Sequence, residues 1–164
     1  KEFNFNFVGT RAANIYGECQ DLYRIIPKTI YSIINKKKFF LHGGGKSMRS
    51  FIHIDDACEA TYLVMKNKKA NGEFFNISTK QMISIKDLIK KICKIYKYDY
   101  SKLIIESKER IGKDKFYKLQ NKKIEKFGWK SKVSLEEGIK KTGNWLRENN
   151  KNFTNYDLFY WHKK

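Results

Sequence analysis

The chain has 164 residues, 41% hydrophobic and 15% aromatic, which suits a single globular domain with a sizeable core. Its formal net charge is +18, and strongly basic chains bind polyanions such as nucleic acid. The excess, however, is almost entirely Lys spread along the chain, and only five Arg occur, the residue expected for bidentate phosphate or guanine contacts. The composition therefore disfavours nucleic-acid binding as the main function.

Cysteine and histidine patterns argue against disulfides and metal sites. Cys19, Cys58 and Cys93 are far apart and form no C-x-x-C pair, which is typical of reduced thiols in the cytoplasm. Cys58 and Cys93 are expected on apolar helix faces, where they act as small hydrophobic residues. The three histidines show no metal-ligand spacing. No apolar run approaches the ~20 residues of a membrane span, and without an initiating Met we expect the native chain to start upstream.

The first element in chain order is a strand. Aromatic residues alternate with polar ones from Phe3 to Phe7, and small residues follow up to Tyr16, which predicts a buried strand that ends in a loop. After this loop, Pro27 occupies a place typical of a first helical turn, and isoleucines give residues 27–34 an apolar helical face.

A glycine-rich stretch comes next. The letters LHGGGKSMRSF (residues 41–51) resemble a phosphate-binding P-loop, but G-x-x-x-x-G-K-[ST] requires a glycine five residues before Gly45, where this chain has Phe40. A Walker-type NTPase is therefore disfavoured. The stretch instead predicts two short strands joined by a tight turn, with Arg49 at the start of the second strand. On these residues alone, a plain turn beside a solvated Arg is an equal alternative.

Helices and short strands alternate through the rest of the chain. The segments that predict helices are residues 53–69, residues 84–96, a brief helix ending at Gly128, and residues 134–150. Ser84 with Asp87 and Ser134 with Glu137 resemble capping boxes. The apolar face of the first of these helices is expected to carry Ala57, Ala60, Thr61, Val64 and Met65. Short strands are predicted within residues 73–79 and 102–107.

This alternation predicts an α/β fold with at least part of a parallel sheet. A nucleotide-binding sheet normally opens with a glycine-rich turn between strand and helix, yet no G-x-G-x-x-G occurs here. We therefore expect that the cofactor-binding half of such a fold is missing from this chain.

Five stretches of the chain resemble one known family. These are RAANIYG, LYRIIPKTI, LHGGGKSMRSFIHIDDACEA, GEFFNIS and the segment from ERIGKD to TGNWL. Their order and spacing are similar to those in the C-terminal half of the extended short-chain dehydrogenases/reductases that act on nucleotide sugars. The resemblance covers residues 8–148 and is greatest to the dTDP-glucose 4,6-dehydratase branch. One such motif is weak evidence, but five in register are strong.

The resemblance implies a fold, an activity and a cofactor. Residues 1–164 would form the last strands of a Rossmann-like parallel sheet plus the small substrate-binding lobe, the C-terminal substrate-binding portion of the enzyme. Enzymes of this branch use NAD to oxidise a hexose at C4, eliminate water across C5 and C6, and return the hydride to C6. NAD would be bound mainly by the absent N-terminal part, so this chain alone would be inactive. The implied partners are a nucleoside-diphosphate sugar and, in the full-length enzyme, a second copy in a homodimer, with no membrane.

The family's catalytic Tyr-x-x-x-Lys also lies upstream of the RAANIYG strand. The pattern occurs here at Tyr62, Tyr98 and Tyr160, each followed by a Lys four residues later, but none of these stands on the helix before that strand. With Lys so abundant, such matches are expected by chance. No catalytic residue is therefore assigned in this chain.

The main substrate-binding residues implied by the resemblance are Asn14 and Arg49. Asn14 matches an Asn at a strand end whose amide donates to the sugar or diphosphate; alternatively, it fixes the following turn through its own side chain. Arg49 matches the Arg that grips the diphosphate, a role suited to a planar and permanently charged guanidinium.

The resemblance implies further binding residues, and for each of them a purely structural role is a comparable alternative. Asn76 matches a strand-end Asn near the nucleotide or else forms a turn, and Arg110 matches a second diphosphate contact or else belongs to a solvated charged face. The apolar segment that packs against the base is matched by Ile25, Ile26 and Pro27, which could equally be the hydrophobic start of a helix.

Two positions depart from the pattern of the dehydratase branch, and they leave the identity of the base and of the sugar open. Lys113 stands where the dehydratase branch often has His, and it would meet a phosphate as a point charge. Ser50 and Phe51 stand where Asp-Trp is usual. A nucleotide-sugar 4-epimerase of the same family is therefore an alternative, as is a non-catalytic basic module that binds nucleotides or nucleic acid.

Overall fold

The chain folds into helices and short, mostly parallel strands, which confirms the predicted α/β class. The computed structural model describes residues 5–109, 112, 114–153, 156 and 158. Within them, three sheets are two-stranded parallel pairs. These pairs are β1 (Val8–Ala12) with β6 (Glu73–Ile77), β2 (Asn14–Tyr16) with β5 (Phe51–His53), and β3 (Phe39–His42) with β8 (Ile104–Ser107).

A fourth sheet carries Arg49. Its middle strand β4 (Met48–Arg49) pairs in parallel with β9 (Phe116–Tyr117) and antiparallel with β7 (Ile83–Ser84). Arg49 therefore ends a strand, and Ser50 separates it from β5. The prediction that Arg49 starts the second strand was wrong. Arg49 is the last residue of the short strand β4, and the second strand of the prediction is interrupted at Ser50, where the chain passes to another sheet.

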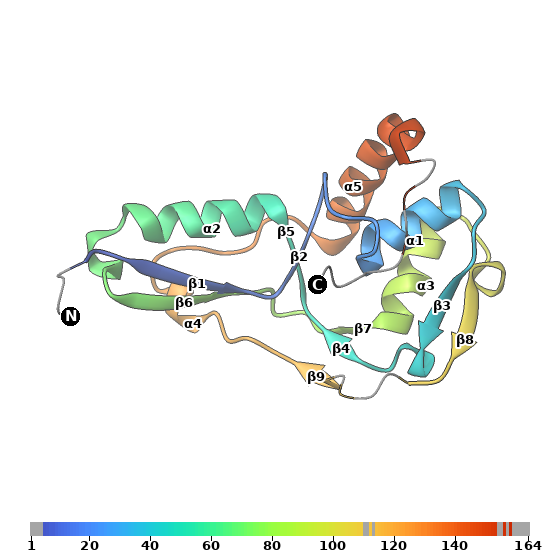
Figure 1. Cartoon of the computed structure of the whole chain (residues 1–164). Coiled ribbons are helices and arrows are strands. Elements are labelled where there is room, and N and C mark those ends of the chain that lie inside the picture. The colour runs from blue at the N-terminus through green and yellow to red at the C-terminus, as the bar shows by residue number, and fades with distance from the viewer. Residues whose placement is uncertain (1–4, 110–111, 113, 154–155, 157, 159–164) are drawn as a thin grey trace.

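One end of the molecule is built on β1 and β6. Helix α2 (Ile54–Lys66) runs along this strand pair, and α4 (Lys122–Glu125) lies beside β6 and contributes Ile124 to the core at this end (Figure 1). Phe75 and Ile77 of β6 are buried in this core with Ile52 and Trp129. Phe74 points to the opposite face, where it is 49% exposed and meets Phe7 edge-on. This strand pair is thus packed on one face and open on the other.

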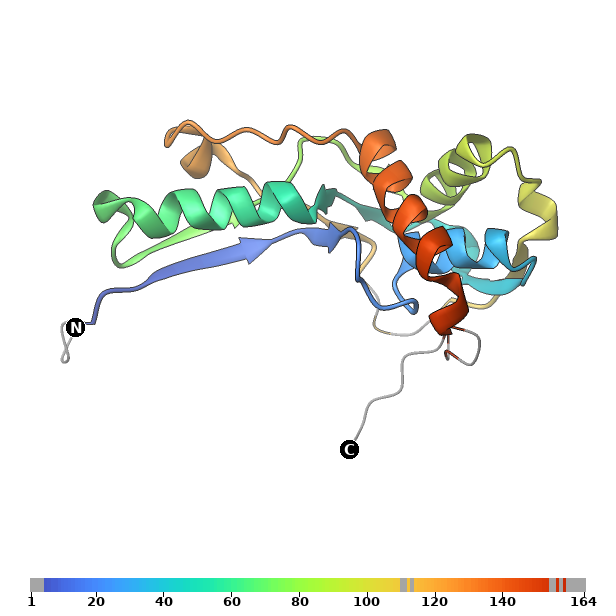
Figure 2. The ribbon, with the colours of Figure 1, turned by 90° about the horizontal axis from the view of Figure 1, so that it is seen from above.

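Three helices form the other end. α1 (Ile25–Ile34) contacts both α3 (Ile85–Ile95) and α5 (Leu135–Asn149), and α1 and α3 lie next to the β3–β8 pair (Figures 1 and 2). Ser84 Oγ accepts from Asp87 N at 3.0 Å, and Ser134 Oγ accepts from Glu137 N at 3.1 Å. Both predicted Ser caps are therefore confirmed. Between these elements lies a large core of isoleucines, leucines and aromatic residues contributed by all three helices.

The glycines between β3 and β4 form a short 3-10 turn, not a phosphate loop. Gly43, Gly44 and Gly45 have φ angles of 57°, 60° and 66°, in the left-handed region that favours glycine. A Cβ on Gly45 would lie 2.9 Å from the backbone N of Lys86, so this turn packs directly on the start of α3. The Lys46 side chain is exposed, as expected for a residue outside any phosphate loop.

Two local predictions were wrong. The first strand begins at Val8, and Phe5 and Phe7 before it are open to solvent, 78% and 43% exposed. On α2, the buried stripe consists of Ala57, Ala60 and Val64, whereas Cys58, Thr61 and Met65 are exposed, Met65 by 61%. The stripe is narrower than predicted because α2 packs mainly on one narrow strand pair. Cys93 is buried, as predicted.

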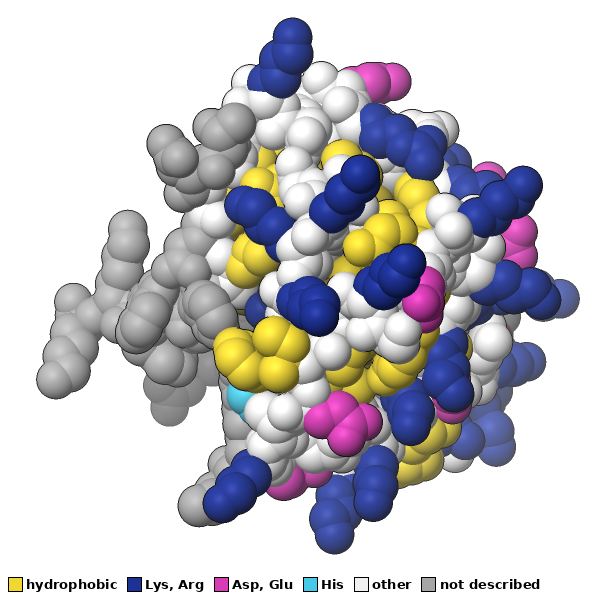
Figure 3. Space-filling view, turned by 90° about the vertical axis from the view of Figure 1, so that its right-hand side faces the viewer, with side chains coloured by type: hydrophobic (Ala, Val, Ile, Leu, Met, Phe, Trp, Pro, Cys, Tyr) yellow, Lys and Arg dark blue, Asp and Glu magenta, His cyan; other side chains and the backbone are white. Residues whose placement is uncertain are grey.

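The basic residues are dispersed. On the face shown in Figure 3, Lys and Arg side chains stand apart from one another with hydrophobic patches between them. This face therefore lacks the continuous basic stripe of many nucleic-acid-binding surfaces. In the part of the chain that the structure describes, no helix is long and apolar enough to cross a membrane.

Candidate functional site

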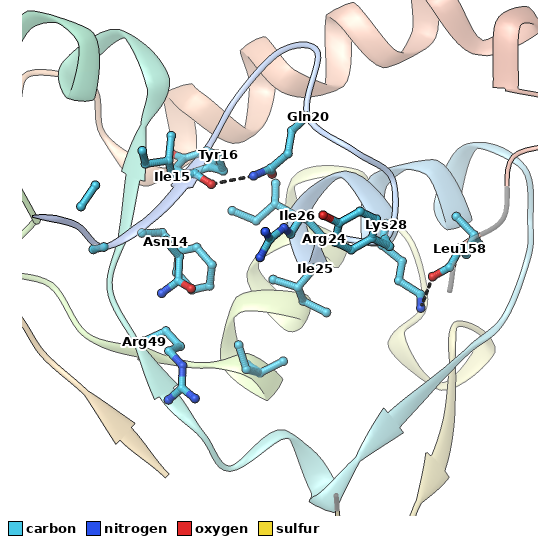
Figure 4. A pocket seen from close by; sticks show the side chains of 15 residues that line it. Asn14, Ile15, Tyr16, Gln20, Arg24, Ile25, Ile26, Lys28, Arg49 and Leu158 are labelled. Atoms are coloured by element: carbon cyan, nitrogen blue, oxygen red, sulfur yellow. Dashed lines mark hydrogen bonds between the residues drawn. The ribbon is translucent and has the colours of Figure 1, made fainter. Parts of the chain in front are cut away.

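A cavity of about 820 Å³ opens where β2, the start of α1 and the end of β4 meet (Figure 4). Its walls come from segments distant in the chain, joined by the parallel pairing of β2 with β5. The described lining residues are Ala12, Ala13, Asn14, Ile15, Tyr16, Gln20, Tyr23, Arg24, Ile25, Ile26, Lys28, Arg49, Phe51, Ile85 and Leu158.

Asn14 begins β2 and lines the cavity. Its Nδ2 donates to the backbone carbonyl of Ser50 at 3.0 Å, and its backbone N donates to the same oxygen at 3.3 Å. The side chain therefore bonds across to the β4–β5 connection, and it does not fix its own turn. Among the described residues, Asn14 Oδ1 has no hydrogen-bond partner, which leaves the amide able to accept from a ligand.

Arg49 lines the same cavity from the end of β4. One terminal nitrogen donates to Met48 O at 2.8 Å and the other to Asp114 O at 2.6 Å. These two bonds fix the plane of the guanidinium and attach it to the segment before β9. Because Arg carries five N–H donors, three further donors remain for other partners.

The other predicted residues divide into three groups. Ile25 and Ile26 line the cavity, whereas Pro27 is buried in the first turn of α1 and is not among the lining residues. Asn76, on β6, is also outside this cavity, and its Nδ2 donates to Gln120 O at 3.2 Å. Arg110 and Lys113 lie outside the described residues. The structure thus brings four of the eight predicted residues to one cavity: Asn14, Ile25, Ile26 and Arg49.

Several lining residues were not singled out from the sequence. Arg24 and Lys28 are the most informative, because they stand one helical turn apart on either side of the apolar pair Ile25 and Ile26. The Arg24 guanidinium lies 5.1 Å from the centre of the Tyr23 ring. In the sequence, the i, i+4 spacing of these two cations at the start of a predicted helix was the one pattern that could have indicated them.

The cavity wall is cationic. Arg24, Lys28 and Arg49 line it, and no Asp or Glu occurs among its described lining residues. In addition, no side chain caps the N-terminus of α1, which carries the positive end of the helix dipole. The arrangement therefore favours an anionic ligand.

Tyr16 forms part of the wall but is not suited to act as a base. It is 2% exposed, and its hydroxyl donates to Leu135 O at 3.3 Å. Burial, and then the charge of Asp56, raise the Tyr16 pKa well above its ordinary value, so the phenol is neutral. Of the Tyr-x-x-x-Lys matches, Tyr62 is 53% exposed under Lys66, and neither Tyr62 nor Tyr98 lines the cavity. Tyr160 lies outside the described residues.

The described residues do not fit a dinucleotide by themselves. A dinucleotide normally rests on a glycine-rich turn between a strand and a helix. Here the glycine-rich turn, Gly43–Gly45, connects β3 to β4, and β5 runs directly into α2. We therefore derive no step through NAD from this chain. Across the described ranges, no group of three His, Cys, Asp or Glu side chains could hold a metal ion.

Parallel strands, helices packed beside them and a cationic cavity at the strand ends match the Rossmann-like α/β fold class. The family model of the NAD-dependent epimerase/dehydratase family matches residues 1–78. The chain belongs to this family, within the extended short-chain dehydrogenases/reductases.

Particular relatives are dehydratases and epimerases. Human dTDP-D-glucose 4,6-dehydratase is 35% identical over 162 residues, covering 96% of this chain and 46% of the human protein. A trifunctional UDP-glucose 4,6-dehydratase of Arabidopsis thaliana is 32% identical over 149 residues, covering 91% of this chain and 22% of that protein. The chain thus spans less than half the length of these relatives.

Solved structures agree with this family. UDP-glucose 4-epimerase from Thermotoga maritima, solved with UDP-glucose, has a TM-score of 0.84 at 28% identity, covering 91% of this chain and 48% of that one. A dTDP-glucose 4,6-dehydratase from Streptomyces venezuelae, solved with NAD, has a TM-score of 0.81 at 29% identity, covering 87% and 44%.

Proposed function

We propose that this chain is the C-terminal substrate-binding portion of an NAD-dependent nucleotide-sugar 4,6-dehydratase, and that its cavity holds the nucleoside diphosphate. The observation that supports this most directly is the cationic wall formed by Arg24, Lys28 and Arg49. A diphosphate has the negative charge that such a wall attracts, and a guanidinium pairs bidentately with phosphate oxygens.

The distribution of side chains supports one orientation of the ligand. Asn14 and Arg49 lie on one side of the cavity, and the apolar side chains of Ile25 and Leu158 lie on the other (Figure 4). A diphosphate beside Arg49 lets the sugar reach Asn14, while the base rests on the apolar side. The volume of about 820 Å³ lies within the range of roughly 300–1,000 Å³ typical of small-molecule sites.

The remaining parts of the activity belong to the full-length protein. The portion outside this chain would bind most of the NAD and supply the Tyr base, and the full-length enzyme would be a homodimer. This chain would bind and orient the substrate and would be inactive alone. The human and Streptomyces venezuelae relatives, both named as dTDP-glucose 4,6-dehydratases, support this choice of reaction.

Calorimetric titration of the chain with dTDP tests the proposal. We expect saturable binding that Arg49→Ala weakens by on the order of 10- to 100-fold, because loss of a charged hydrogen-bonding partner costs about 1.5–3 kcal/mol. The matched control is Lys46→Ala, since Lys46 is exposed and does not line the cavity. If Lys46→Ala abolished binding while Arg49→Ala left it unchanged, the assignment would be wrong. Steeply salt-dependent binding of single-stranded DNA, without saturable dTDP binding, would instead indicate a basic binding module.

A nucleotide-sugar 4-epimerase is the second candidate. The TM-score of 0.84 to the Thermotoga maritima UDP-glucose 4-epimerase favours it. Mass spectrometry of the product formed by the full-length protein separates the two reactions. Dehydration lowers the mass of the nucleotide sugar by one water molecule, whereas epimerisation leaves it unchanged.

A further inference from the structure

A segment near the C-terminus lies along one side of the cavity. It comprises the 3-10 turn Asn150–Phe153 together with Tyr156 and Leu158, and we call these described residues the C-terminal strap. Leu158 lines the cavity. The other lining residues belong to the β1–β2 segment, the loop before α1, α1, β4, β5 and the start of α3, so the strap is an additional wall.

The first half of the strap is attached to the body of α1. Tyr31 Oη donates to Phe153 O at 2.8 Å. The amides of Asn35 and Asn150 bond to each other in both directions, at 2.9 and 3.3 Å. The Phe153 ring also packs on Trp145 of α5, with ring centres 5.7 Å apart. These contacts attach the start of the strap to α1 and α5.

The second half of the strap contacts two parts of the cavity wall. Tyr156 Oη donates to Asp21 Oδ1 at 2.8 Å, and Asp21 belongs to the loop that supplies Tyr23 and Arg24 to the wall. Lys28 Nζ donates to the backbone carbonyl of Leu158 at 3.0 Å (Figure 4). Two of the three lining cations are thus connected to the strap, Arg24 through its loop and Lys28 directly.

We propose that the C-terminal strap is a positioning element of the nucleotide-sugar site, which holds Lys28 and the Asp21 loop in place for the anionic ligand. The proposal rests on the proposed function of the cavity. Asp21 accepts the Tyr156 hydroxyl, which restrains the loop carrying Arg24. One of the three Lys28 donors is used by Leu158, which keeps the ammonium at the cavity wall. A wall ordered in advance loses less conformational entropy when the ligand binds.

Coupling between strap and ligand must be reciprocal. If an attached strap strengthens nucleotide binding, bound nucleotide stabilises the attached strap by the same factor. Lys151 is exposed within the strap and is a site for trypsin. We therefore expect dTDP to slow cleavage after Lys151 in the wild-type chain, a readout that a merely structural role of the strap would not produce.

The test compares Tyr156→Phe with Tyr62→Phe. The first removes the hydroxyl that meets Asp21; the second removes a hydroxyl from an exposed ring of α2 that lies outside the cavity lining. In stopped-flow measurements with dTDP, we expect Tyr156→Phe to raise the dissociation rate roughly three- to tenfold with little change in association, and to abolish the protection of Lys151. Tyr62→Phe should match the wild type in both readouts.

A second variant keeps the proposal falsifiable if Tyr156→Phe impairs folding. Lys28→Met keeps an unbranched side chain one atom shorter than that of Lys and removes the charge, and we expect it to weaken dTDP binding about tenfold and to reduce the salt dependence of binding. The proposal is overturned if the wild type binds dTDP but Tyr156→Phe and Lys28→Met both behave like Tyr62→Phe. Failure of the wild-type chain to bind dTDP would overturn the proposed function and this proposal together.

Discussion

Replacing Asp56 by Asn removes one of the two acceptor oxygens that join the start of α2 to the segment before α5. Asp56 is 2% exposed, and its two carboxylate oxygens accept from Lys132 N at 2.9 Å and Val133 N at 3.0 Å. A hydrogen bond to a charged group contributes about 1.5–3 kcal/mol, and Asn retains only one of the two acceptors. We therefore expect Asp56→Asn to lower the free energy of unfolding by about 2–4 kcal/mol.

Urea unfolding followed by circular dichroism measures this loss, and thermal unfolding should show a decrease in Tm of about 5–15 °C. The matched control is Asp55→Asn. Asp55 lies in the same first turn of α2, so the helix dipole acts on both carboxylates, but its side chain is 58% exposed and pairs with Lys141 in solvent. Exposed ion pairs contribute little. Equal destabilisation by the two substitutions would refute the reasoning, because only Asp56 makes the two buried bonds.

Three further predictions concern packing and pH. Gly143→Ala should destabilise the chain by about 1–3 kcal/mol in urea unfolding, because the new Cβ would overlap the Tyr96 hydroxyl. Gly45→Ala should cost about 1–3 kcal/mol more than Gly44→Ala: both have positive φ, but only at Gly45 would the Cβ meet backbone, 2.9 Å from an amide nitrogen. Equal costs would show that φ alone matters. Burial raises the Cys93 pKa from 9.0 to about 11, so the folded chain holds this proton more tightly than the unfolded chain. Stability should therefore fall as pH rises from 9 to about 11, and Cys93→Ala should make this fall shallower by up to about 1.4 kcal/mol per pH unit. An unchanged slope would contradict the cause given.

Elements determined by nearby residues could be predicted from the sequence. The start of α3 depends on Ser84, three residues before the amide it caps, and the periodicity of α3 lies within a few turns. The first strand was misplaced because its start depends on a distant partner. Val8 is opposite Glu73, and this pairing, not the alternation of Phe3 to Phe7, determines where β1 begins.

The cavity also combines features that the sequence indicates with features that depend on contacts between distant residues. Asn14 and Arg49 were identified through a resemblance in motif order, but their meeting depends on the pairing of β2 with β5. Arg24 and Lys28 were overlooked because an i, i+4 pair of cations ordinarily belongs to a solvated helix face. The fold places both residues in the wall of a cavity that β2 and β4 also line, which their spacing in the sequence does not indicate. Asn76 follows the same kind of motif as Asn14, yet in this structure it bonds to Gln120 away from the cavity.

The open side of β1 has a practical consequence. Among the described residues, β1 is hydrogen-bonded on one edge only, and the face that carries Phe7 and Phe74 is uncovered. An unpaired strand edge beside exposed aromatic rings is a template on which another strand can pair. The oligomeric state of the isolated chain should therefore depend on its concentration. Ligand titrations need to be repeated at several protein concentrations, because self-pairing along β1 would change the species being titrated.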